Sequence, residues 1–277
     1  MADDGYDTLM DYLEKCRSVQ LRGMRQALLE RRCQERARQM GCGTLHDYAQ
    51  VLRSCPHEMD NLLDALLIKE TRFFRDPLTY TILHQRLLPE MLRHRAERRE
   101  PFVRLWSVGC ATGDEAYTLA LLTWDVAEKY SKNFQIHVLA TDRDREALEA
   151  ARVGRYGRER LGDLPVRLVD RFFQYDNGMY RVVPELRHRV RYVAHDLLQD
   201  KSPVPPDAVF KDFDLVSCQN VFMYYDRQAQ EVMAWRLYGA LQIGGVLVLG
   251  MAESLPPSLG GAFERLDVKC ALYRRVA

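Results

Sequence analysis

The sequence predicts an α/β protein: a domain built on a parallel sheet, with a small antiparallel β-insertion, preceded by an all-helical N-terminal domain. Three observations support this. Short apolar runs alternate with helical patterns after residue 102, as in parallel sheets covered on both faces. The first 90 residues contain no convincing alternating strand. Between residues 165 and 195 short strand-like pieces surround Asn177-Gly178, which is a strong hairpin signal.

Composition narrows the class of protein. The 277 residues suffice for one large domain or two modest ones, and the formal net charge of +1 argues against a nucleic-acid-coating protein. No apolar run is long enough to span a bilayer, and no secretory signal is visible at the start. The seven cysteines form no CxxC pair and do not cluster with histidines, so we predict reduced thiols in the cytoplasm and no metal site.

The N-terminal region predicts three helices. Residues 17–38 combine seven arginines with leucines and a methionine near helical spacing, which indicates an amphipathic helix with a basic outer face. Such a face is either an ordinary solvated surface or a docking surface for an acidic partner. Residues 45–52 and 57–68 predict two further helices.

Domain boundaries follow from a change in composition. The charged run at 91–101, closed by Pro101, predicts a linker between a helical domain at 1–90 and an α/β domain at 102–277. Four runs predict strands of the second domain, namely 102–108, 136–141, 213–218 and 245–250. Helices are expected at 115–129, 145–152 and 227–241, and the β-insertion at about 165–195, with strand-like pieces at 172–175, 179–183 and 190–193.

Ligands of open α/β sheets bind beyond the carboxyl ends of the strands, and polar groups of this sequence gather there. The turn from Gly109 to Gly113 lets the backbone pass close to a ligand, but it is not the GxGxxG pattern of nicotinamide and flavin proteins. Asp142 ends the second strand, where an acid can accept both hydroxyls of a ribose; it or Asp144 could instead cap the following helix.

Three more residues complete this candidate site. Glu115, in the first turn of the helix after the glycines, is either a partner of the helix dipole or an attractor for a cationic ligand. The Asn220 side chain can both donate and accept hydrogen bonds, which suits the amino-acid part or the adenine edge of a ligand. Tyr224 either packs in the core or belongs to the site. Together these residues suit a ligand that carries a ribose, an adenine and a positive charge but no phosphates, and S-adenosylmethionine fits that description. The absence of GxxxxGK[ST] removes the common nucleoside triphosphate alternative.

Several ordered motifs resemble the CheR family, the chemotaxis-receptor glutamate O-methyltransferases. KETRFFRDP at 69–77 is similar to that family's NxTxFFR segment. LWS at 105–107, continuing through CATGDEAY at 110–117, is similar to WSxxCSTGEEPYS. ATDRD at 140–144 resembles ATDID, and CQNVFMYYD at 218–226 resembles CRNVMIYFD. The likeness covers nearly the whole chain.

The resemblance implies a Rossmann-like methyltransferase domain with a β-subdomain. It also implies which residues line the S-adenosylmethionine pocket, namely Thr71, Arg75, Glu115, Asp142, Asp196, Leu197, Asn220 and Val221. Together with Gly109 and Gly113 of the turn, these are the predicted cofactor-binding residues. Arg75 and Tyr224 are the implied catalytic residues, with Tyr224 beside the transferred methyl group. Lys69 replaces the usual Asn and Met251-Ala252-Glu253 the usual His-Ser-Glu. The insertion is shorter than in enzymes that grip a receptor pentapeptide, so we do not expect pentapeptide tethering.

The implied reaction transfers a methyl group from S-adenosylmethionine to glutamate side chains of chemoreceptors, giving methyl esters and S-adenosylhomocysteine for sensory adaptation. A glutamate carboxylate is already ionised at neutral pH, so no general base is needed. The basic helix would then steer acidic receptor helices, and we expect Arg25 and Arg32 to take part. Two alternatives stay open: a signalling module that binds S-adenosylmethionine without methylating receptors, and a methyltransferase for another protein or a small molecule. We expect neither nucleic-acid binding nor membrane insertion.

Overall fold

The computed structural model describes residues 5–17, 21, 23–66, 71–130, 134–200, 202, 204–205 and 212–277. The chain forms two compact units. A helical unit comprises Met1–Glu70 together with Tyr224–Ala229, and a larger unit comprises Thr71–Met223 and Gln230–Ala277. No helix of the described residues has both the length and the apolar character needed to cross a bilayer.

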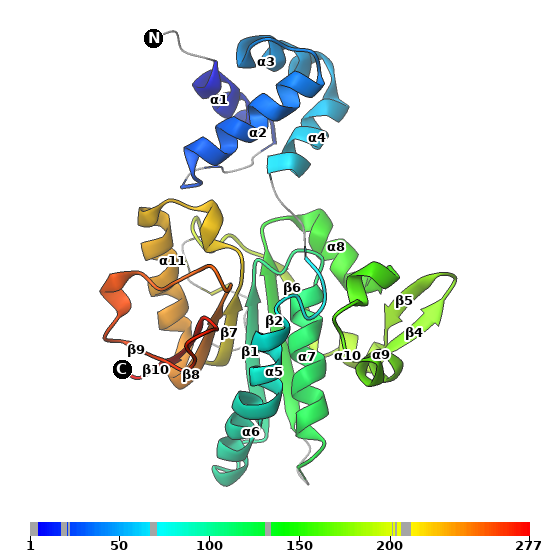
Figure 1. The fold of residues 1–277 in the computed structure, drawn as a ribbon, viewed down its shortest axis with the longest axis vertical. Helices are drawn as coiled ribbons and strands as arrows, with labels where there is room; N and C mark the ends of the chain where they lie inside the picture. Colours follow the sequence, from blue (N-terminus) through cyan, green and yellow to red (C-terminus); the bar gives the residue numbers. More distant parts are fainter. Residues whose placement is uncertain are drawn as a thin grey trace. The chain divides into compact units, whose positions relative to one another are not determined.

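The helical unit contains α1 (Tyr6–Arg17), α2 (Gln26–Gln39), α3 (Leu45–Ser54) and α4 (Pro56–Leu66), shown in blue in Figure 1. The helices predicted at 45–52 and 57–68 are confirmed as α3 and α4, although residues 67–68 lie outside the described residues. The single helix predicted over 17–38 is wrong at residues 21 and 23–25, which are not helical, while residues 18–20 and 22 lie outside the described residues. The chain turns at Gly23, whose φ of +82° is unfavourable for residues with a side chain, and α2 begins only at Gln26.

A buried carboxylate connects three of these helices. Glu58 of α4, 2% exposed, accepts hydrogen bonds from the Arg36 guanidinium of α2 (Nε–Oε1 3.0 Å) and the Tyr48 hydroxyl of α3 (2.6 Å). Burial alone would raise the pKa of Glu58, but these hydrogen bonds lower it below its usual value. The ionised carboxylate therefore stabilises the helical unit.

The larger unit is built on a seven-stranded sheet in the order β6-β2-β1-β7-β8-β10-β9 (Figure 1). The four predicted strands are confirmed as β1 (Phe102–Val108), β2 (Gln135–Asp142), β7 (Phe213–Cys218) and β8 (Leu241–Leu249), all parallel. β6 (Val190–Ala194) pairs parallel to β2, and β9 (Phe263–Arg265) and β10 (Leu272–Arg275) add an antiparallel edge.

Helices between the strands cover this sheet. Those predicted are α7 (Asp114–Ala127), α8 (Arg145–Val153) and α11 (Arg227–Ala240). Others are α5 (Pro77–Ile82), the π-helical turn η1 (Leu83–Leu87), α6 (Leu88–Glu97), η3 (Phe222–Tyr224) and η4 (Pro257–Leu259). Almost every residue of α7 is buried, because this helix packs on β1, β2 and β6 and is flanked by α6, η1 and α10.

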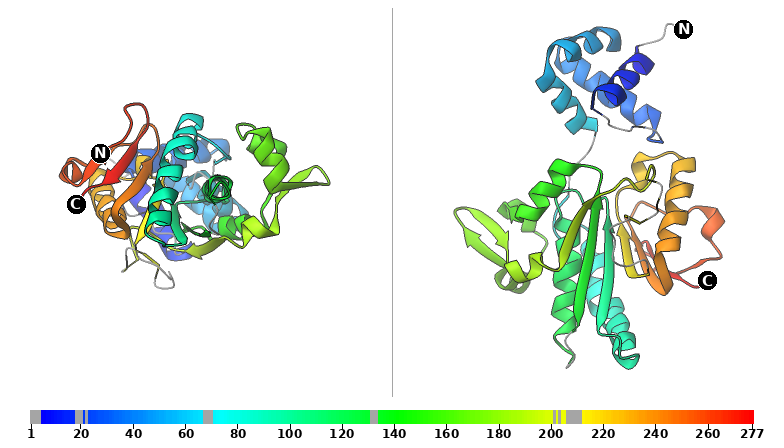
Figure 2. Two further views of the ribbon diagram at one scale, coloured as in Figure 1. Left: turned by 90° about the horizontal axis from the view of Figure 1, so that it is seen from below. Right: turned by 180° about the vertical axis from the view of Figure 1, so that it is seen from behind.

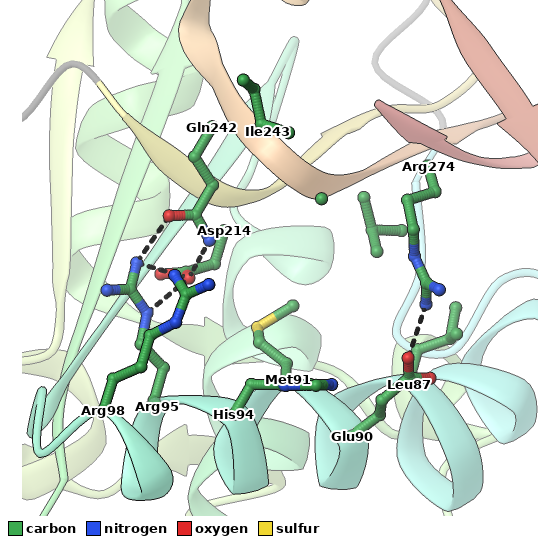
Figure 3. Close-up of a pocket in the computed structure, with 12 residues that line it drawn as sticks. Leu87, Glu90, Met91, His94, Arg95, Arg98, Asp214, Gln242, Ile243 and Arg274 are labelled. Carbon is green, nitrogen blue, oxygen red and sulfur yellow. Dashed lines mark hydrogen bonds and ion pairs between the residues drawn. The ribbon is translucent and has the colours of Figure 1, made fainter. Parts of the chain in front are cut away.

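The prediction of a linker at 91–101 is wrong, because most of this segment belongs to α6, which packs on α7 and β1. Its charged side chains face outward, but Leu92 is fully buried and the Arg95 guanidinium donates to Asp214 of β7 (Nε–Oδ1 2.8 Å). Figure 3 shows this contact beside a cavity of about 210 Å³, with Gln242 of β8 bonded to both partners. The boundary between the compact units therefore falls at residue 70 rather than near 90.

The antiparallel insertion forms a separate three-stranded sheet that projects away from the main sheet (Figures 1 and 2). Its strands are β3 (Arg155–Tyr156), β4 (Phe173–Asp176) and β5 (Met179–Val182), accompanied by η2 (Arg158–Leu161), α9 (Val166–Phe172) and α10 (Pro184–Arg187). The hairpin at Asn177-Gly178 is confirmed, with φ of +48° and +80°. The piece at 190–193 was assigned wrongly to the insertion, because β6 pairs with β2 of the main sheet.

Candidate cofactor and active site

The predicted site residues of the larger unit follow neighbouring strands. β1, β2 and β7 are adjacent and parallel, so the segments after Val108, after Thr141 and after Cys218 meet at one edge of the sheet. β6 adds the segment after Ala194 on the outer side of β2. The strand order therefore gathers four of the predicted segments from distant parts of the sequence.

Asp142 organises the turn after β1. One carboxylate oxygen accepts the Ala111 amide (2.8 Å) and the other the Asp144 amide (2.9 Å). The cap of α8 is Asp144, whose side chain accepts the amides of Glu146 and Ala147. Asp144, and not Asp142, is therefore the cap of α8, and the ribose-binding role of Asp142 stays a prediction. Burial raises the pKa of Asp142.

The two glycines of the turn differ in role. Gly109 is exposed with φ of +67°, and a Cβ there would lie 2.6 Å from Cγ2 of Val221. Gly109 and Val221 thus lie against one another, and only glycine allows this approach. Gly113 is buried with φ of +90°, and a Cβ there would lie 2.6 Å from the Tyr192 hydroxyl and 2.8 Å from Ala151. Gly113 therefore serves close packing at the start of α7.

The hydrogen-bond donors around Glu115 are neutral. Its carboxylate accepts the Ser107 hydroxyl of β1 (2.6 Å) and the Gln219 amide (Nε2–Oε2 3.1 Å), and Gln219 also contacts the Tyr80 hydroxyl (2.9 Å). Burial raises the pKa of Glu115 to about 7, which the hydrogen bonds only partly counteract. Among the described residues no cation pairs with this carboxylate, so a cationic ligand would find it uncompensated.

The segment after β7 is held by a second buried carboxylate. Asn220 has φ of +59°, and its backbone amide donates to the Glu253 carboxylate (N–Oε2 2.9 Å). The amides of Met223 (3.1 Å) and Gly250 (2.8 Å) donate to the same carboxylate, which is 8% exposed. Burial raises the pKa of Glu253. Asn220 and Val221 therefore occupy a fixed loop beside the glycine turn.

The remaining predicted residues of the larger unit flank these segments. Asp196 caps a turn by accepting the amides of Leu198 and Gln199, and Leu197 is buried. Thr71 and Arg75 are half-buried, and Arg75 contributes to the electrostatic environment of Tyr80, the partner of Gln219. Lys69 lies outside the described residues.

Tyr224 belongs to the helical unit, whereas Arg75 and the cofactor-binding candidates belong to the larger one. Its carbonyl accepts the Arg25 amide (2.8 Å), and the Arg32 guanidinium lies 5.7 Å from the centre of its ring. The neighbouring Tyr225 forms an isolated antiparallel bridge with Met24.

Sequence reasoning missed three contributors: Ser107, Gln219 and Glu253. The signal for Ser107 was a polar residue inside an otherwise apolar strand, and a buried hydroxyl needs a partner. Gln219 falls on the Arg of the CRNVMIYFD pattern, so a neutral amide replaces a cation next to Glu115. Glu253 is the one residue of Met251-Ala252-Glu253 that agrees with the His-Ser-Glu pattern.

Comparisons with known proteins identify a family for this chain. Residues 69–271 match the family described as CheR methyltransferase, SAM binding domain, and residues 4–67 match the CheR methyltransferase all-alpha domain. Chemotaxis protein methyltransferase 1 of Pseudomonas aeruginosa is 30% identical over 92% of this chain and 91% of its own length. The chemotaxis protein methyltransferase of Borreliella burgdorferi is 26% identical over 86% and 83%.

One similar protein is much longer than this chain. An uncharacterised 104.1 kDa protein of Rhodobacter capsulatus is 34% identical over 79% of this chain, which spans only 22% of that protein. Both family matches lie in order along the chain and together cover most of it. The fold, the strand-end site and these matches lead to one conclusion: the chain belongs to the CheR family of S-adenosylmethionine-dependent methyltransferases.

Proposed function

We propose that this protein transfers the methyl group of S-adenosylmethionine to glutamate side chains of chemoreceptors, in the cytoplasm, giving glutamate methyl esters and S-adenosylhomocysteine. The single observation that carries the proposal is the uncompensated Glu115 carboxylate beside the Asp142 turn. A ligand with a ribose and a cationic amino-acid end fits this pair of carboxylates. Relatives named chemotaxis protein methyltransferase support a substrate in chemotaxis.

Strand order suggests how the residues share the cofactor. Asp142, at the end of β2, would accept the ribose hydroxyls, and the segment with Asp196 and Leu197 after β6 would lie on the adenine side. Glu115, bonded to Gln219 after β7, would hold the ammonium group of the methionine half. The exposed Gly109 turn would lie between these ends, and Asn220, which follows Gln219 in the chain, would lie at the methionine end.

When bound, S-adenosylmethionine supplies a methyl group on a positively charged sulfur, which is a strong electrophile. The residues of this chain then have to position the substrate carboxylate in line and exclude water. The substrate glutamate is ionised at neutral pH, so no side chain has to remove a proton. We assign Arg75 the task of guiding that carboxylate, and the catalytic role of Tyr224, which belongs to the helical unit, stays a prediction.

The basic surface of α2 supports a protein substrate, although it differs from the expected one. Arg32 is 7% exposed and donates to the Leu66 carbonyl (2.7 Å), so it stabilises the helical unit and is not part of an outer face. Arg31 and Arg38 are exposed on α2, and Arg25, exposed just before it, donates to the Tyr225 carbonyl. We assign electrostatic steering of acidic receptor helices to Arg31 and Arg38.

The test uses methyl-labelled S-adenosylmethionine and membranes containing chemoreceptors. We expect label in the receptor band that alkali releases as methanol, because methyl esters hydrolyse at high pH while N-methyl groups do not. Asp142→Asn should lose cofactor binding and methylation together. Cofactor binding without ester formation on any receptor would overturn the proposed reaction in favour of a signalling module. Label that survives alkali would favour another methylation chemistry.

A further inference from the structure

Glu253 is a buried carboxylate whose known bonds all go to backbone amides. It accepts the amide of Gly250 at the end of β8 and the amides of Asn220 and Met223 after β7, at 2.8, 2.9 and 3.1 Å. Among the described residues no cation pairs with it. A charge buried without a counter-ion is costly, and charge-assisted bonds from fixed amides are the only compensation found here.

The carboxylate determines the shape of one loop. Asn220 has φ of +59°, a conformation that costs free energy for any residue with a side chain. A Cβ at Gly250 would lie 2.9 Å from the Asn220 nitrogen, so the two segments are in direct contact. Glu253 therefore joins the segments after β7 and β8 and holds the 220–223 loop, with Asn220 in its strained conformation, before any ligand arrives.

Strand order indicates which half of the cofactor this loop meets. In the order β6-β2-β1-β7-β8, Asp142 follows β2 on one side of β1. The partner of Glu115, Gln219, follows β7 on the other side. If Asp142 holds the ribose and Glu115 the ammonium group, the loop at 220–223 lies at the methionine end, where the methyl group is bound.

We propose that Glu253 is a positioning residue, which holds the 220–223 loop in the shape that seats the methionine half of S-adenosylmethionine and so aims the methyl group. This inference rests on the proposed function of the same site. It adds a residue that would touch neither cofactor nor substrate and would act through Asn220 and Val221.

The decisive comparison uses two ligands. S-adenosylhomocysteine carries both halves, whereas 5′-methylthioadenosine keeps the adenosine and lacks the amino-acid end. Glu253→Gln keeps the size of the side chain but turns one acceptor oxygen into a donor that opposes an amide. We expect about tenfold weaker binding of S-adenosylhomocysteine, as for the loss of one charge-assisted bond, and about the same affinity for 5′-methylthioadenosine.

A matched control separates this effect from lost stability. Asp214 is also a buried carboxylate that accepts a backbone amide, from Arg104, but it lies at the opposite end of β7. Asp214→Asn should lower the melting temperature at least as much as Glu253→Gln and leave the affinity for S-adenosylhomocysteine unchanged. In turnover, Glu253→Gln should lower kcat as well as raise KM for S-adenosylmethionine, because the methyl group is misaimed.

The outcomes distinguish this inference from the proposed function. Equal losses for both ligands, or no loss in either, would overturn the positioning role while the wild-type protein still binds and methylates. If wild-type protein does not bind S-adenosylhomocysteine, the proposed site itself is wrong. Should Glu253→Gln fail to fold, Glu253→Asp keeps the charge on a shorter side chain, and the same selective loss for S-adenosylhomocysteine is required of it.

Discussion

The Glu115 carboxylate makes cofactor affinity depend on pH near neutrality. Its partners, Ser107 and Gln219, are neutral, and burial raises its pKa to about 7. Only the ionised form attracts the ammonium group of the ligand, so binding draws a proton off the carboxylate. The affinity must therefore rise with pH up to and through the pKa of Glu115 and level off above it.

The size of the effect follows from the pKa of the free protein. The apparent dissociation constant is multiplied by one plus the ratio of protonated to ionised carboxylate. With a pKa of about 7, this factor is about 11 at pH 6, about 2 at pH 7 and about 1.1 at pH 8. Between pH 6 and pH 8 the affinity of the wild-type protein should thus rise about tenfold.

Titration calorimetry with S-adenosylhomocysteine at pH 6, 7 and 8 measures this directly. Glu115→Gln is the matched variant, because an amide has the same size and cannot ionise. The ligand titrates identically with both proteins, so the ratio of their dissociation constants reports Glu115 alone. Repeating the titration at pH 7 in buffers of different ionisation enthalpy should show about half a proton released per ligand.

Two results would refute this reasoning. An affinity ratio between the two proteins that is constant from pH 6 to 8 would mean that Glu115 does not titrate in this range. A Glu115→Gln variant that binds as tightly as wild type at pH 8 would mean that the carboxylate does not face the ligand. The second result would return Glu115 to the role of a helix-dipole partner.

Three further predictions concern other parts of the chain. Reversing charge at Arg31 and Arg38 should weaken receptor methylation more at low than at high salt in rate assays, while equal effects at both would exclude steering. Glu58→Gln should lower the free energy of unfolding in urea titrations by about 2 kcal/mol; the exposed Glu35→Gln should change it by less than about 0.5 kcal/mol, and equal losses would refute the buried network. Gly113→Ala should cost about 1–3 kcal/mol in the same titration because of its positive φ and filled Cβ position, and an unchanged midpoint would contradict that geometry.

The parts of the fold that the sequence predicted are those where the signal is local. Runs such as 102–108 and 213–218 are apolar and β-prone, so they identify buried parallel strands without tertiary information. Asp142 and the glycine turn could be assigned to a site because the carboxyl ends of parallel strands meet by rule. The Asn177-Gly178 hairpin was equally local.

The errors arose where the partner of a segment decides its role. The run at 91–101 looks polar because the residues that it exposes are mostly charged, and its buried face depends on Asp214, more than a hundred residues away. The strand at 190–194 has the same composition whether it pairs with β2 or with the hairpin. Arg32 was counted with the basic face because only the Leu66 carbonyl distinguishes it from its exposed neighbours.

The contacts that could not be predicted from the sequence are those that hold the site's loops in their conformations. Phe74, Ala111 and Asn220 have positive φ values of 56°, 45° and 59°, and each lies in a segment that carries a family motif. A left-handed residue with a side chain costs about 1–2 kcal/mol, which the surroundings must offset. The Asp142 carboxylate does so for Ala111 and Glu253 for Asn220.

This offset has a functional consequence. Loops already held in a strained shape lose little entropy when a ligand arrives, so binding energy is not spent on ordering them. Replacing either carboxylate should therefore weaken cofactor binding even where the carboxylate itself does not touch the ligand. Affinity at this site would depend on two carboxylates, Asp142 and Glu253, and on the backbone strain at Ala111 and Asn220 that they offset.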